Sequence, residues 1–153
     1  MLNRLFPRHA DNTYQGHVAA LWLAGALTFL KAAVALNSIF NTRRVAMGAD
    51  GIPLARFGPD AQSTILSLFA LNAFGWLVLA LVGLAVLIRW RSLVPFLLLI
   101  SLFEQLGRRF IVQSHDIVRA DTAIATIVTW GALGVVVLAL ILSLLPGRVR
   151  GAV

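Results

Sequence analysis

Four long apolar runs divide this sequence, and each is long enough to cross the hydrocarbon core of a membrane. They cover residues 17–40, 64–88, 92–111 and 122–145. A membrane-spanning helix needs about 20 predominantly apolar residues, and helices satisfy all of their backbone polar groups internally. The runs therefore predict an all-α integral membrane protein, with one domain of four transmembrane helices in an antiparallel bundle.

The composition supports this class and excludes several chemistries. Charged residues make up 12% of the chain and hydrophobic residues 59%, whereas a soluble domain is about 25% charged. There is no cysteine, which excludes disulfides, thiolate metal sites and iron–sulfur clusters. The three histidines lack ligand spacing, so no metal and no cofactor is expected. The net charge of +7 comes from arginines just outside the apolar runs. This placement indicates membrane lipids as partners and no nucleic acid.

The polar regions before and after the first apolar run are longer than a simple turn. Residues 1–16 are mixed and polar, and they predict a tail or an interfacial segment anchored by apolar side chains such as Phe6 and Tyr14. Residues 41–63 form the longest polar connection, with a turn signal at Asp50-Gly51. This extramembrane loop predicts a small hairpin or a structured cap over one mouth of the bundle, with an ordinary solvated loop as the alternative.

Arginine placement bears on the orientation. Six arginines fall on the side of the termini and six on the other side, so a count of basic residues is a tie. Arginine density is highest in the short turn at residues 89–91, and most of the acids fall on the longer loops of the opposite side. These two features predict both termini in the cytoplasm, with the chain in a bacterial inner (plasma) membrane.

Helical spacing suggests which faces pack together. Ala24, Thr28, Lys31, Ala35 and Ser38 share one small and polar face of the first run. Small and hydroxyl residues permit close approach of helices in lipid, so this face is predicted to point inward.

In the second run, Asn72 is the main polar residue, and Gly75 and Gly83 are predicted small contacts on roughly its face. The very short turn between the second and third runs predicts that they are antiparallel neighbours.

A carboxylate, Glu104, lies in the apolar stretch 93–106. A charge inside a bilayer costs about 3 kcal/mol on insertion scales, so it needs a partner or a function. With a rise of about 1.5 Å per residue, Lys31 and Glu104 fall at nearly the same depth, about 20 Å from the side of the termini. The predicted polar layer comprises Lys31, Asn72, Glu104, Arg108, Thr126, Thr129 and Trp130.

Two interpretations of this layer remain open. In the first, Lys31 and Glu104 form a closed ion pair that sets helix register, with neighbouring polar groups completing its hydrogen bonds. In the second, the layer lines a cavity in which Glu104 titrates or binds a polar head group. Its mouth would then be formed by Arg43, Arg44, Arg109 and His115. One pair can serve both roles.

Three functions are compatible with the sequence. The first is a protein that binds a lipid or lipophilic small molecule, or that serves as an accessory subunit of a larger membrane complex. The second is a small transporter or channel, which would require a homo-oligomer because four helices rarely enclose a pore, with Glu104 and Lys31 in the path. The third is an intramembrane enzyme acting on a lipophilic substrate through Glu104, Arg108 and His115. The sequence leaves open whether the protein is an enzyme.

Overall fold

All regular elements in the described chain are helical. The computed structural model describes residues 2–115 and 123–146. Most of this chain lies in four long helices: α2 (Val18–Phe40), α4 (Pro59–Arg89), α5 (Val94–Ser114) and α6 (Ala123–Leu144). The remaining elements are short: α1 (Leu2–Leu5), α3 (Thr42–Gly48), η1 (Leu54–Arg56) and η2 (Arg91–Leu93). The long helices agree with the four predicted runs, and α4 begins five residues earlier than expected.

Three helices in the described residues are long and apolar enough to cross a membrane: Val18–Phe40, Pro59–Arg89 and Ile127–Leu144. The sequence predicted four such spans. The difference is α5, in which every stretch of span length includes Glu104, Arg108 and Arg109. Charge density, rather than length, separates α5 from the other long helices.

The connection between α2 and α4 is a compact helical cap, and the predicted small hairpin is wrong because the segment contains no strand. Helix α3 starts directly after α2, and the chain then turns through Gly51, whose φ of 64° favours glycine. The turn lets the Ile52 amide donate to the Ala46 carbonyl at 2.9 Å. Ala46 and Leu54 are fully buried, so the alternative of a structured cap describes this segment.

Helices α2 and α4 pack through small residues. The predicted inward face of α2 is confirmed, because Ala24, Ala35 and Ser38 are almost fully buried. On α4 the buried positions before its last turn are Ala73, Ala80 and Gly83. Side chains this small let two helix backbones approach closely without a polar gap.

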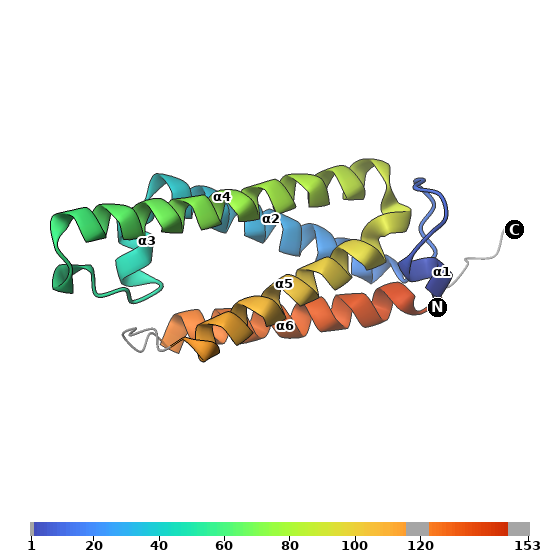
Figure 1. Ribbon diagram of the computed structural model, residues 1–153. Coiled ribbons are helices and arrows are strands. Elements are labelled where there is room, and N and C mark those ends of the chain that lie inside the picture. The colour runs from blue at the N-terminus through green and yellow to red at the C-terminus, as the bar shows by residue number, and fades with distance from the viewer. Residues whose placement is uncertain (1, 116–122, 147–153) are drawn as a thin grey trace, which may run out of the picture.

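Helix α5 leaves α4 after their shared turn and lies along α6 (Figure 1). The short turn predicted α4 and α5 as neighbours, but the small face of α4 is already occupied by α2. A core of Ala24, Val86, Val94, Leu98 and Ala139 joins all four long helices near the chain's N-terminal end.

Away from that core the four helices are less tightly packed. Beyond Leu98, α5 has no buried residue, and the described side chains of α6 have none before Val136. The pair α2–α4 and the pair α5–α6 therefore meet closely at one end and share few buried contacts at the other.

The close approach of α2 and α4 gives a testable prediction. A Cβ on Gly83 would lie 3.1 Å from both Oγ1 and Cγ2 of Thr28, whereas a Cβ on Gly75 would meet nothing within 4 Å. Overpacking a tight contact costs about 1–3 kcal/mol. We expect Gly83→Val to lower the unfolding free energy by this amount. Gly75→Val, the matched control on the same helix, should have little effect in denaturant titrations of the solubilised protein. Equal losses for the two variants would contradict the packing.

Candidate functional site

The predicted ion pair between Lys31 and Glu104 is confirmed. Lys31 Nζ donates to Glu104 Oε2 at 2.6 Å. The two side chains keep 22% and 18% of their surface exposed, so the protein covers the pair without closing it. Lys31 comes from the inward face of α2, and Glu104 comes from the part of α5 that has no buried residue. The contact therefore joins the two helix pairs where few other contacts do.

The depth of the pair follows from helix geometry. Lys31 lies about 20 Å along α2 from Val18, and Glu104 about 15 Å along α5 from Val94, at about 1.5 Å per residue. Both helices run in the same direction away from the N-terminal end (Figure 1). The two charges therefore occur near the middle of the long axis, far from either end of the molecule.

Two arginines that follow Glu104 on α5 are stacked on tryptophans of different helices. The Cζ atom of Arg108 lies 4.1 Å from the ring centroid of Trp76 on α4. That of Arg109 lies 3.6 Å from the ring centroid of Trp130 on α6. Arg108 and Trp130 are both exposed, and cation–π contacts at exposed sites contribute about 0.5–1 kcal/mol. Adjacent residues thus tie α5 to both neighbours.

Sequence reasoning missed the stacking on Trp76. An Arg-Arg pair on α5, with a tryptophan on each neighbouring apolar run, was the signal that could have suggested these contacts. The signal alone does not say which arginine meets which ring.

The Arg109 side chain has unsatisfied donors. Its Nε and Nη2 atoms are buried without a hydrogen-bond partner among the described residues, and so is Gln105 Oε1 one turn earlier on α5. The Arg109 donors and the Gln105 acceptor therefore belong to residues one turn apart on the same helix.

Other predicted members of the layer lie elsewhere. Asn72 is exposed on α4, because the face that packs on α2 is set by Ala73 and Ala80, one helical position away. Gly75 is likewise exposed and not a helix contact. Thr129 is exposed on α6. The side chain of Thr126 lies outside the described residues.

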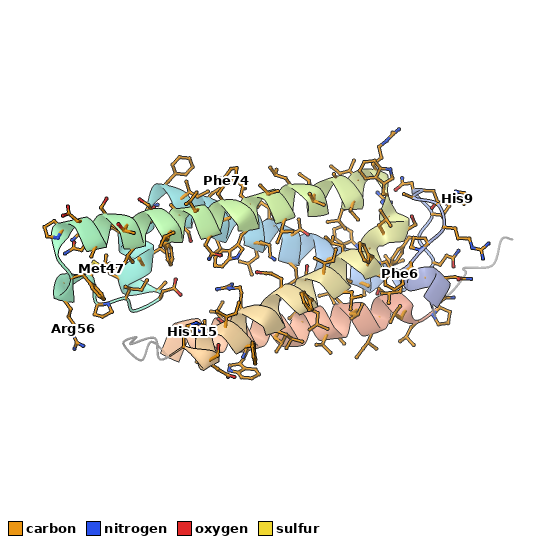
Figure 2. The ribbon with its side chains drawn as sticks, viewed as in Figure 1. Phe6, His9, Met47, Arg56, Phe74 and His115 are labelled. Carbon is orange, nitrogen blue, oxygen red and sulfur yellow. The ribbon has the colours of Figure 1, made fainter. Side chains whose placement is uncertain are left out.

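Three of the four predicted mouth residues lie at the end of the molecule that carries α3: Arg43 and Arg44 on α3 (Figure 1), and His115 after α5 (Figure 2). The fourth, Arg109, lies within α5 on the Trp130 ring. Arg43 donates from Nη2 to Gln62 Oε1 at 3.2 Å, which ties α3 to α4. Arg44 is exposed. His115 is at the end of α5 (Figure 2), where its Nδ1 lies 3.0 Å from the Ile111 carbonyl oxygen. These contacts do not bring the residues to the ion pair.

An apolar groove lies between α2 and α6, and one of its lining residues directly precedes Lys31 in the sequence. Its volume is about 270 Å³, and its wall on α2 ends at Leu30, immediately before Lys31. The lining residues are Ala26, Leu27, Leu30, Val128, Gly131, Ala132 and Val135. Sequence patterns could not predict this groove, because it depends on how far α6 diverges from α2 beyond their common core.

The site offers few groups for metal or nucleophilic chemistry. Among the residues that the structure describes, no three of His, Cys, Asp or Glu are grouped so as to hold a metal ion. Lys31 and Glu104 do not themselves line the groove.

A comparison of this chain with protein-family models, with curated proteins and with solved structures finds no match. The function must therefore be inferred from the geometry of the helices and of the ion pair.

Proposed function

We propose that the chain is a multi-pass membrane protein in which α5 forms a fourth span beside the three long apolar helices. Large apolar side chains around the molecule support this. Five aromatic residues are between 74% and 80% exposed: Trp22, Phe29, Phe40, Phe103 and Phe110. Extensive exposed apolar surface is unfavourable in water at about 25 cal/mol per Å², and it is the expected surface in lipid.

The charges of α5 are compatible with a span because each one has a partner. Glu104 pairs with Lys31, and Arg108 and Arg109 stack on tryptophans. Intramembrane charges are tolerated when they are paired in this way. We further propose that both termini lie on the cytoplasmic side of a bacterial inner membrane, supported by Arg89 and Arg91 at the short turn.

Within this membrane domain, we propose that the protein binds a lipid or a lipophilic small molecule. The observation that carries the proposal is the apolar groove between α2 and α6, which ends on α2 at the level of the partly open Lys31–Glu104 pair. An apolar chain would occupy the groove between α2 and α6. Because Lys31 directly follows Leu30 of the groove wall, a polar head group at the end of that chain would be at the level of the pair. The head group would complete hydrogen bonds that lipid tails cannot supply.

Two glycines of α6 provide a test of ligand binding. Neither Gly131 nor Gly134 has an atom within 4 Å of an added Cβ, but only Gly131 lines the groove. Gly131→Leu should fill the groove and abolish retention of a lipophilic species at about one per chain, detected by mass spectrometry of the purified protein. Gly134→Leu should retain it.

The two glycine variants also define the outcome that would overturn the proposal. Both should unfold near the wild-type denaturant concentration, since an added Cβ meets no atom within 4 Å at either position. If the wild-type protein carries no stoichiometric lipophilic species, or if Gly131→Leu retains it as well as Gly134→Leu does, the groove is not a ligand site.

A further inference from the structure

The segment before α2 is folded back across the N-terminal end of the helices. Asp11 and Ser92 exchange three hydrogen bonds. The Asp11 amide donates to Ser92 Oγ at 3.0 Å, and Ser92 donates to the Asp11 carbonyl from Oγ at 2.9 Å and from its amide at 3.2 Å. Figure 2 shows Phe6 and His9 on this strap, at the end opposite His115. We call residues 2–17 the strap. Its hydrogen bonds to Ser92 attach it to η2, and its last residue leads into α2.

The strap is also attached to the last turn of α6. Arg4 Nη1 donates to the Leu144 carbonyl at 3.0 Å, and the His17 amide donates to the Leu142 carbonyl at 3.1 Å. A cation at the C-terminus of a helix is stabilised by the partial negative charge there. Contacts on two sides therefore fix the strap in place over the helix ends.

A second cavity of about 270 Å³ lies under the strap, at the opposite end of α2 from the cap. Its lining is largely polar and includes Arg4, Arg8, His9, Asp11, Tyr14 and Ser92. It shares no lining residue with the apolar groove. Any ligand of this cavity is therefore recognised by different chemistry.

The lining of this cavity has an excess of positive charge. Arg8 has no hydrogen bond or ion pair within the described part of the chain. The one acid, Asp11, is engaged by Thr13, whose amide donates to Asp11 Oδ1 at 3.0 Å. The Thr13 hydroxyl and amide hold the pKa of Asp11 below its usual value, and burial raises the pKa of Tyr14 to about 12. Tyr14 is therefore a neutral hydroxyl near neutral pH.

We propose that this cavity binds a phosphate group, with Arg8 and Arg4 as its cationic ligands and the His9 ring N–H as a further donor. Guanidinium groups match the geometry of phosphate oxygens. Arg89 and Trp90 end α4 on the same side of the molecule, and such residues mark the level of lipid head groups. The phosphate belongs either to an anionic lipid of that leaflet or to a free phosphate in the adjoining solution.

The test measures lipid retention by native mass spectrometry of the full chain in detergent, titrated with phosphatidylglycerol. We expect one lipid per chain to bind in preference to further copies. Arg8→Gln should weaken this binding about tenfold, the loss expected for one charge-assisted contact. Arg89→Gln is the matched control, because it removes one exposed arginine at the same end without lining the cavity. It should change binding by about twofold or less.

Further experiments distinguish a lipid phosphate from a free phosphate, and this cavity from the apolar groove. Displacement of the lipid by millimolar inorganic phosphate identifies a free phosphate as the ligand, and its persistence identifies the lipid. The dependence of phosphatidylglycerol binding on Arg8 separates this cavity from the groove, because Arg8 lines only this cavity. The site is overturned if neither probe binds, or if the Arg8 and Arg89 variants lose affinity equally.

Discussion

Replacing Lys31 with methionine, or Glu104 with glutamine, is expected to lower the free energy of unfolding by about 3 kcal/mol, and the double replacement should restore most of it. Each single variant leaves one charge of a 2.6 Å pair without its partner. The uncompensated charge then lies in the part of the molecule where α5 and α6 have no buried residues. In a membrane, bulk water does not reach this part to solvate the charge. Removing both charges leaves two side chains of similar shape and no unpaired ion.

The measurement is equilibrium unfolding in mixed micelles for wild type, both single variants and the double variant. Arg44→Met is the control, because it removes an exposed cation from α3 without touching the pair. Wild-type stability in Glu104→Gln would contradict a stabilising ion pair. A double variant as unstable as the singles would show that the loss in the singles does not come from an unpaired charge.

Replacing Gly16 with valine should release the strap from α6 and lower stability by about 1–3 kcal/mol, the cost of overpacking a close contact. Gly16 is buried. A Cβ there would overlap the Ser143 carbonyl oxygen and lie 2.5 Å from the Tyr14 hydroxyl. The backbone oxygen cannot rotate away as a side chain can, so the strap must move instead.

Hydrogen exchange at the His17 amide reports this movement directly, because that amide donates to Leu142 at 3.1 Å. We expect exchange there to accelerate in Gly16→Val and the phosphate group to bind more weakly. Gly25→Ala is the control, since an added Cβ meets nothing within 4 Å in the middle of α2. That variant should be neutral or more stable by up to about 1 kcal/mol. Unchanged His17 exchange in Gly16→Val would contradict the close packing of the strap.

The proximity of Lys31 and Glu104 could be predicted from sequence because it depends mainly on how far each residue lies along its own helix. Each charge lies a known number of residues from the end of its apolar run, and the helical rise converts that number to a distance. Asn72 could not be placed in the same way. Depth alone did not place Asn72, because successive residues of a helix are separated by about 100° around the axis. A one-residue change in the packing face of α4 therefore moved Asn72 to the exposed surface.

The sequence by itself determined the helical class, the bounds of the long helices and the inward face of α2. These features depend on apolar run length and spacing along one segment. Only the tertiary structure decided that α5 lies along α6, that Arg108 and Arg109 stack on Trp76 and Trp130, and that a groove and a strap-covered cavity exist. The physical reason is that each of these requires the rotation and crossing of two helices far apart in sequence. The rotation and crossing of the helices are set by the fit of many side chains at once, and not by any single apolar run of the sequence.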